Sequence, residues 1–401
     1  MNVPPYSDPA GALNRMQRVY LDFNATAPLR AEARAACLSA LDLPGNASSV
    51  HGEGRAARAT IETARAAVAE LAGVAPRGVT FTASGTEAAN LVLTPRLAMP
   101  PGAAPPARLI VSAGEHACIL RGRRFAAESV AIAPLRADGR IDLDALARLL
   151  ARDEGPAMLA LQGANNETGV VQPVAEAAAL VHAAGGIVVC DAVQLAGRAP
   201  CSAAALGADF LILSAHKLGG PKGAGALAAA SSEIAVTLPL VRGGGQERGL
   251  RAGTENVAAI AGFGAAAACA ATERAQEAAR LETLREALAA EVAKVAPDAV
   301  VFGAGAPRLP NTLCFAVPGV GAETLLIALD LAGVAASSGA ACSSGKVARS
   351  HVLAAMGISP ALAAGAIRLS LGWSSDAADV ARFGAAFAEV MGRLRRGRSA
   401  A

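Results

Sequence analysis

The chain has 401 residues, of which 53% are hydrophobic and 17% are charged. This length exceeds what one simple hydrophobic core usually holds, and the composition supplies enough apolar side chains for a large and a small domain. The net charge of +3, from 36 basic and 33 acidic residues, excludes the strongly basic surface that is typical of nucleic-acid-binding proteins.

The first twenty residues, MNVPPYSDPAGALNRMQRVY, lack a basic start followed by an apolar run, so we expect no secretory signal peptide. Between residues 60 and 240, short apolar runs alternate with alanine-rich segments of helix length. GVTFTA, ARLIVSA, VAIAPL, MLALQGA, GIVVCDA and ADFLILSA predict strands, and TEAANLVLTPRLA and VAEAAALVHAAG predict helices. Most strand runs lack polar alternation, as expected where both faces are covered. The pattern predicts an α/β domain with a mostly parallel sheet.

Ligands of open α/β sheets bind where the strands end, so the residues after each predicted strand are candidates for chemistry. Ser84, Gly85 and Thr86 follow the first run and begin a helix, which suits an anion site and equally a simple helix cap. His116 follows the second run, where a lone histidine is more often structural. Asn166 follows MLALQGA in a segment that is also typical of a turn.

Two charged residues follow the last two runs. Asp191 ends GIVVC, and a carboxylate there is costly unless it caps a helix, joins an ion pair or meets a buried cation such as a protonated pyridine nitrogen. Lys217 follows ADFLILS and precedes glycines, in a chain with only four lysines. A buried lysine has a lowered pKa and suits Schiff-base chemistry, whereas a lysine at a strand end can also extend its ammonium group to solvent.

Together these strand ends offer an anion-binding turn, a histidine, an amide, an acid and a lysine. This set matches a phosphorylated aldehyde cofactor with a ring nitrogen, and pyridoxal 5′-phosphate (PLP) meets each requirement. A nicotinamide dinucleotide site would need GxGxxG after the first strand, and a P-loop would need GxxxxGK[ST]. Neither motif occurs there.

Beyond residue 240 the chain changes in character. An Ala/Glu/Arg-rich stretch predicts a helix from about residue 255 to 295, and NTLCFAVPG, AETLLIALDLAG and AIRLSLGW indicate a smaller α+β domain. The most membrane-like segment, VAAIAGFGAAAACAA, is shorter than the ~20 residues that span a bilayer, so we expect a buried helix and no membrane association. Seven cysteines without a CxxC pair argue against a disulfide framework or a thiolate metal site and favour the cytoplasm.

Longer motifs extend over nearly the whole chain. They are VYLDFNATAPLR, GNASSVHGEGRAAR, FTASGTEAAN, GEHACI, NNETGVVQP, CDAVQ, SAHKLGGPKGAGAL, GGGQERGLRAGTEN, SSGAACSSG and IRLSLG. They resemble the cysteine desulfurases, in the class V aminotransferase group of fold type I PLP enzymes, with SAHKLGGPKG and SSGAAC the most specific. The resemblance implies a large PLP-binding α/β domain with a mostly parallel seven-stranded sheet (31–260), and a smaller α+β domain carrying the catalytic-cysteine loop (261–401). Residues 1–30 would pack with the small domain.

The resemblance also implies roles for the candidate residues. Lys217 would bind the cofactor covalently and shuttle protons at the substrate Cα, and His116 would stack on the ring and assist proton transfer. Further cofactor contacts would come from Asp191 to the ring nitrogen, Gln194 to the ring hydroxyl, Gly85, Thr86, Ser214 and His216 to the phosphate, and Thr254 to the phosphate of the neighbouring subunit of a homodimer. Asn166 and Arg368 would hold the substrate carboxylate, which a guanidinium binds with two hydrogen bonds.

The implied reaction removes sulfur from L-cysteine. Cys342, as a thiolate, would attack the substrate sulfur, L-alanine would leave, and Cys342 would carry a persulfide. A nearby cation favours a thiolate, and Lys346 and Arg349 stand in the same segment, although His116 is the family's candidate base. The acceptor would be an iron–sulfur scaffold or a sulfur carrier protein, and the similarity to the long-loop group points to iron–sulfur cluster assembly.

The segment after Cys342 departs from the family pattern. Where many members have LEPS, this chain has VARS preceded by Lys346, so an acidic residue is replaced and the segment becomes basic. The acceptor, the pathway and the need for an activator therefore stay open. A selenocysteine lyase and a small-amino-acid aminotransferase are alternatives, as is a non-catalytic protein that binds an assembly partner. The joint presence of Lys217, Asp191 and Cys342 argues against the last.

Overall fold

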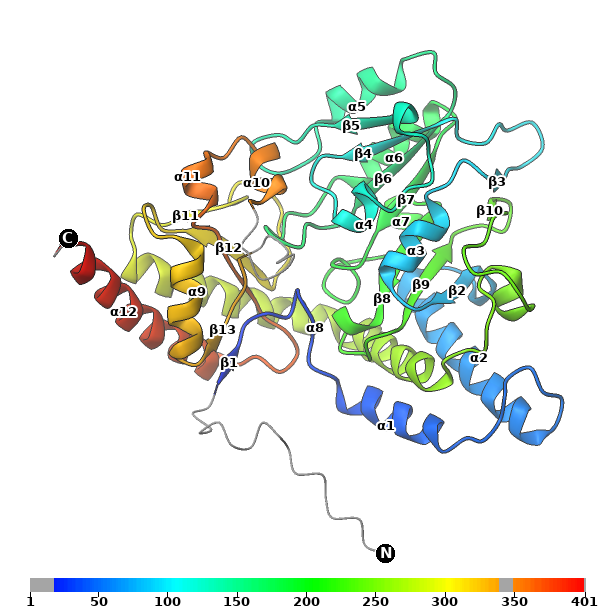
Figure 1. Cartoon of the computed structure of the whole chain (residues 1–401), viewed down its shortest axis with the longest axis horizontal. Helices are drawn as coiled ribbons and strands as arrows, with labels where there is room; N and C mark the ends of the chain where they lie inside the picture. The colour runs from blue at the N-terminus through cyan, green and yellow to red at the C-terminus, as the bar shows by residue number, and fades with distance from the viewer. Residues whose placement is uncertain (1–17, 339–348, 400–401) are drawn as a thin grey trace, which may run out of the picture.

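The computed structural model describes residues 18–338 and 349–399. Its larger sheet has seven strands in the order β2-β9-β8-β7-β6-β4-β5 (Figure 1). These strands are β2 (Val79–Thr82), β4 (Arg108–Ser112), β5 (Val130–Ala133), β6 (Ala157–Gln162), β7 (Ile187–Asp191), β8 (Phe210–Ser214) and β9 (Gly225–Ala229). Pairing is parallel from β8 to β5, and β9 is antiparallel to both β8 and β2. The predicted mostly parallel sheet is confirmed, and each predicted run forms one of its strands.

Helices cover both faces of this sheet. They are α1 (Ala31–Leu41), α2 (Gly52–Ala72), α3 (Gly85–Val92), α4 (Ala117–Leu120), α5 (Leu143–Leu150), α6 (Val174–Ala183), α7 (Ala203–Leu206) and α8 (Val257–Val295), with short 3-10 turns η1 (Pro76–Gly78), η2 (Ala127–Ser129), η3 (Ala215–Lys217) and η4 (Gln246–Gly249). Leu159 and Leu161 of β6 pack in one core with α2, α6 and α8. Met158 and Ala160, which alternate with them, pack in a second core with α3 and α4. Side chains alternate along a strand, so an unbroken apolar run fills two cores.

The helix predicted over TEAANLVLTPRLA is shorter than expected, since α3 ends at Val92. Pro95 explains this end, because proline has no N–H for the helical ladder and disfavours a helical conformation at the residue before it. The residues that follow form β3 (Leu97–Ala98), which pairs antiparallel with β10 (Ala235–Val236).

A smaller sheet has the order β11-β12-β14. Its antiparallel strands are β11 (Val300–Val301), β12 (Thr312–Ala316) and β14 (Ile367–Ser370), and the nearby helices are α9 (Ala322–Leu331), α10 (His351–Ala355), α11 (Pro360–Ala363) and α12 (Ala377–Ser399). Phe315 of β12 meets Phe387 of α12 edge to face, and Phe383 stacks on Phe387. These rings form the centre of the small core.

The N-terminal strand β1 (Val19–Tyr20) pairs in parallel with β13 (Val334–Ala335), and Val19 and Leu21 are buried in the small core. Helix α8 connects the two sheets (Figure 1). Its residues from Ala259 to Ala270 belong to the core of the large sheet, and those from Leu281 to Val292 belong to the small core. The predicted boundary between residues 260 and 261 therefore lies inside α8. No helix in the described ranges is long and apolar enough to cross a membrane.

Candidate active site

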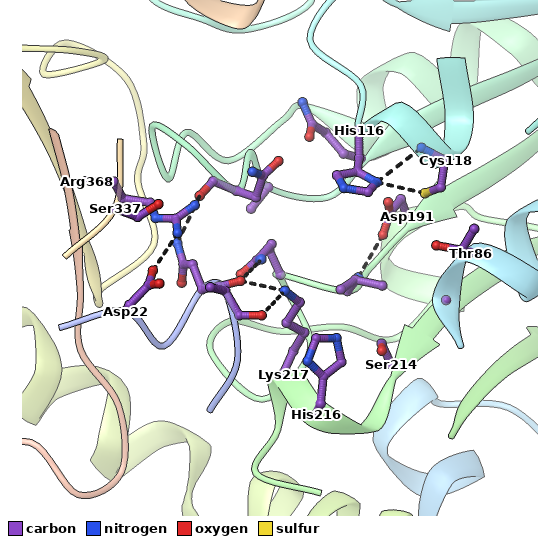
Figure 2. Close-up of a pocket in the computed structure, with 18 of the residues that line it drawn as sticks. Asp22, Thr86, His116, Cys118, Asp191, Ser214, His216, Lys217, Ser337 and Arg368 are labelled. Atoms are coloured by element: carbon purple, nitrogen blue, oxygen red, sulfur yellow. Dashed lines mark hydrogen bonds and ion pairs between the residues drawn. The ribbon is translucent and has the colours of Figure 1, made fainter. Parts of the chain in front are cut away.

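A cavity of about 610 Å³ lies where the carboxyl ends of β2, β4, β6, β7 and β8 face the small sheet (Figure 2). The cavity is lined by eleven of the residues expected from the sequence: Ser84, Gly85, Thr86, His116, Asn166, Asp191, Gln194, Ser214, His216, Lys217 and Arg368. Other residues that line it were not among the candidates, including Asp22, Asn24, Cys118, Gln162 and Ser337. Parallel strands thus bring residues from distant parts of the chain to one edge of the sheet.

Lys217 lies in η3, directly after β8, and its side chain lines the cavity beside Asn24 and Ala25. Nζ donates to the main-chain oxygens of Asn24 at 2.6 Å and Ala25 at 2.7 Å. Burial first, and then the cations Arg198 and Arg368, lower the pKa of Lys217 to about 8, against the opposing effect of nearby acids. A lysine with this pKa has a substantial neutral fraction near neutral pH and can act as a nucleophile.

Asp191 ends β7, and its carboxylate is buried beside the cavity. Oδ1 accepts a hydrogen bond from Val193 N at 3.0 Å. Burial raises the pKa of Asp191, whereas this hydrogen bond and the cationic forms of His116 and Lys217 lower it. A buried carboxylate without a bound cation is costly, so the site suits a ligand that brings a protonated ring nitrogen.

The N-terminus of α3 presents Gly85 and Thr86 to the cavity. Ser84 caps this helix, because its Oγ accepts a hydrogen bond from Glu87 N at 3.1 Å. The same turn therefore caps the helix and lines the cavity. A Cβ atom added at Gly85 would approach the Val193 side chain to 3.2 Å, which is tighter than ordinary packing. Glycine therefore keeps the floor of the cavity open beside Ser214.

His216 completes this end of the cavity. Its pKa is lowered to about 4, first by burial and then by Lys217, Lys222 and Arg198, so the ring is neutral at neutral pH. Its Nδ1 lies 3.2 Å from Thr26 Oγ1. A helix N-terminus, two hydroxyls and a neutral imidazole form a donor set that fits a phosphate group.

His116 caps α4, and its ring faces the cavity next to Cys118 (Figure 2). Nδ1 accepts from Cys118 N at 3.2 Å and lies 3.0 Å from Cys118 Sγ. Because Nδ1 acts as an acceptor, the neutral ring carries its proton on Nε2. Burial lowers the pKa of His116 below its ordinary value, and the cationic forms of Lys217 and His351 add to this effect, against Asp191.

Arg368 enters from β14 of the small sheet and is 4% exposed. Its Nη2 pairs with Asp22 Oδ1 at 2.6 Å, and its Nη1 donates to the main-chain oxygen of Asn166 at 3.0 Å. Its Nε has no hydrogen-bond partner within the described ranges. A buried guanidinium with a spare N–H at a cavity wall is suited to an anionic ligand such as a carboxylate.

Two predicted residues in the described ranges do not line this cavity. Thr254 is exposed and lines a separate cavity of about 190 Å³. Arg349 is exposed to solvent. Cys342, which the sequence analysis made the nucleophile, lies outside the described residues, as does Lys346.

Asp22 and Asn24 are two of the site residues that the predicted strand ends did not indicate. They follow β1, which pairs with β13 rather than with the large sheet, and Asp22 forms a bridge with Ser370. Their only signal in the sequence is the motif VYLDFNATAPLR. Cys118 was missed because its place follows from the capping geometry of His116.

Comparisons with known proteins agree with this architecture. The class-V aminotransferase family model matches residues 19–383. A cysteine desulfurase of Cereibacter sphaeroides is 40% identical over 386 residues, which cover 95% of this chain and 97% of the relative. An IscS-like cysteine desulfurase of Mycobacterium tuberculosis is 38% identical, covering 95% and 98%. The X-ray structure of a NifS-like protein from Rickettsia africae superposes with a TM-score of 0.83 at 34% identity, covering 93% of this chain and 99% of that one. The chain therefore belongs to the class-V aminotransferase family, in its cysteine desulfurase group.

Proposed function

We propose that this protein is a PLP-dependent cysteine desulfurase, which removes sulfur from L-cysteine, releases L-alanine and holds the sulfur as a persulfide on Cys342. The observation that carries the proposal is the meeting of three groups in one cavity. Lys217 has a pKa near 8, Asp191 is a buried carboxyl, and the buried Arg368 has an N–H without a partner among the described residues. Amino-acid chemistry on a pyridine aldehyde needs an amine, an acid and a carboxylate clamp.

The residues present fit PLP. Lys217 would bind the aldehyde carbon, Asp191 the ring nitrogen, Gln194 the ring hydroxyl and His116 the ring face. The phosphate contacts would be Gly85, Thr86, Ser214 and His216, together with Thr254 from a second copy of the chain in a homodimer. When bound, PLP supplies an electron-withdrawing ring that stabilises negative charge at the substrate Cα.

The protein's own groups then divide the proton transfers. Lys217 Nζ, once free and neutral, takes the proton from the substrate Cα, and its lowered pKa favours this neutral form. His116 presents Nε2–H to the cavity, so in this tautomer it acts as a proton donor. Arg368 binds the substrate carboxylate, and the hydrogen bond from its Nη1 to the main-chain oxygen of Asn166 orients the guanidinium.

Sulfur transfer requires the Cys342 thiolate. Its Sγ forms the S–S bond with the substrate sulfur while the substrate Cβ–S bond breaks. The carbon side keeps the electron pair of that bond and receives a proton, which gives L-alanine. The persulfide then passes to a thiol of an acceptor protein, an iron–sulfur scaffold or a sulfur carrier, in the cytoplasm.

The test is a product assay on purified protein with PLP. L-Cysteine with a reductant should give alanine and sulfide in equal amounts and no keto acid. Keto-acid formation from alanine or serine at a comparable rate would instead support an aminotransferase. Turnover of L-selenocysteine without turnover of L-cysteine would support a selenocysteine lyase. The absence of visible absorbance from bound PLP would support a non-catalytic binding protein.

The pKa of Lys217 predicts how PLP capture depends on pH. Only the neutral amine attacks the aldehyde, and a pKa lowered from 10.5 to about 8 makes the neutral amine the major form above pH ~8 rather than above pH ~10.5. The rate of PLP capture by the apoprotein, followed by visible absorbance, should rise about tenfold per pH unit below pH ~8 and then level off. Pyridoxamine 5′-phosphate, which lacks the aldehyde, is the control and should bind without this rise. A capture rate that still increases above pH ~10 would contradict the assignment.

A further inference from the structure

The chain that follows residues 339–348 is fixed to the large sheet by two hydrogen bonds. Ser350 Oγ donates to Glu167 Oε2 at 2.5 Å, and His351 Nε2 donates to the main-chain oxygen of Glu115 at 2.9 Å. We call this pair of contacts the distal anchor. Glu115 directly precedes His116, and Glu167 directly follows Asn166, so the distal anchor adjoins two candidate site residues.

We propose that Glu167 is a positioning residue for sulfur transfer, acting through Ser350 on the chain segment that carries Cys342. This inference rests on the proposed function of Cys342 as the nucleophile. It assigns Glu167 no contact with the substrate or the cofactor.

Glu167 is buried, and hydrogen bonds fix the turn that carries it. Its side chain is buried, with 4% of the residue exposed, although a carboxyl group resists burial. The turn that carries it is held by Asn165 Oδ1, which accepts from Glu167 N and Thr168 N, both at 2.9 Å. The turn therefore presents the Glu167 carboxyl to Ser350 in a fixed orientation.

Ser350 connects this turn to the small domain. Its Oγ also accepts from Leu353 N at 3.0 Å and so caps α10. Leu353 is fully buried in an apolar cluster with Phe302 and Met356. One hydroxyl thus joins the start of a packed helix to the turn that contains Asn166.

The other end of the same segment is fixed nearby. Ser337 and Arg368 exchange main-chain hydrogen bonds, with Ser337 N donating to Arg368 O at 3.1 Å and Arg368 N donating to Ser337 O at 2.6 Å. Arg368 Nη1 in turn donates to Asn166 O. The chain before residues 339–348 is therefore held against Arg368, and the chain after them is held against Glu167, the neighbour of Asn166 in the sequence.

This arrangement predicts which step depends on Glu167. Loss of the Ser350 bond leaves the cofactor cavity and Arg368 intact, so substrate binding should persist. The Cys342 thiolate should align less well with the substrate sulfur. A displacement of a reacting atom by about 1 Å lowers the rate of such a step by up to ~100-fold. We expect a loss in kcat with little change in KM.

The experiment compares Glu167→Met, which keeps the length of the side chain without an acceptor, with Glu167→Gln, which keeps an acceptor oxygen. In the PLP-loaded enzyme, Glu167→Met should lower kcat for alanine formation about 10- to 100-fold with KM within about twofold, and Glu167→Gln should stay within about threefold of wild type. The rate at which iodoacetamide alkylates Cys342 should also change in Glu167→Met alone, with unchanged visible absorbance of PLP. The double variant that also carries Ser350→Ala should have a kcat no lower than that of the less active single variant, because both substitutions remove the same hydrogen bond.

A Glu167→Met enzyme with wild-type kcat and alkylation rate would overturn the inference, as would equal losses in the Met and Gln variants. Should Glu167→Met fail to fold, Ser350→Gly removes the same hydrogen bond from the other side, and glycine is tolerated at the cap of α10 that Ser350 occupies. A wild-type enzyme that forms no alanine and no persulfide on Cys342 would instead overturn the proposed function. The two failures are therefore distinguishable.

Discussion

Replacing Cys342 by serine is expected to abolish persulfide formation and to lower alanine production from L-cysteine by at least about 10³-fold. The attacking group must be a thiolate, and a serine hydroxyl is not ionised near neutral pH. PLP and L-cysteine should still bind, because the cavity residues that we propose hold them are unchanged. Intact-protein mass spectrometry after one turnover measures the persulfide as the gain of one sulfur atom.

The other cysteines support this assignment. Burial raises the pKa of every cysteine in the described part of the chain: Cys37, Cys118, Cys190, Cys201, Cys269 and Cys314. A raised pKa keeps a thiol protonated and inert. Cys118 is the only one of them that lines the cavity, and Asp191 and Glu115 raise its pKa further.

Two matched variants make the Cys342 experiment decisive. Cys37→Ser, on α1 away from the cavity, should keep wild-type persulfide formation. Cys118→Ser removes the rival thiol inside the cavity. If Cys118→Ser abolished the persulfide and Cys342→Ser preserved it, the nucleophile would be Cys118 and the proposed role of Cys342 would be wrong.

The large sheet was predictable because its strands carry their own signal. In β6 and β7, the apolar residues follow one another without polar alternation, and the structure shows why: alternate side chains enter different cores. Strand β9 was missing from the predicted runs. Its sequence, GALAA, has no β-branched residue, and its extended state depends on pairing with β2 and β8.

Some residues of the site could likewise be predicted from the sequence, and others could not. Gly85, His116, Asp191 and Lys217 could be found from the sequence alone, because parallel strands end at a common edge. Arg368 came only from the family resemblance, since β14 reaches the cavity through the packing of a separate sheet. Contacts such as Arg368 with Asp22 join residues from opposite ends of the chain, and no local pattern encodes them.

Lys217→Ala is expected to lower turnover of L-cysteine by about 10⁴-fold, because the variant loses both the amine that binds PLP and the base at the substrate Cα. Nearby Arg198 does not replace it: burial lowers the pKa of Arg198 only to about 10, so the guanidinium stays protonated, and it is engaged with Gln194. Lys222→Ala is the matched control, since Lys222 is exposed and should leave turnover within about twofold.

Borohydride reduction followed by peptide mass spectrometry identifies the lysine directly. In wild-type protein and in Lys222→Ala, PLP should be trapped on the peptide that contains Lys217, and Lys217→Ala should trap none. PLP trapped on Lys222, or turnover of Lys217→Ala at the wild-type rate, would contradict the assignment. The burial of Lys217 against the carbonyls of Asn24 and Ala25 would then have no chemical explanation, because a lysine held there only for structure gains nothing from a pKa near 8.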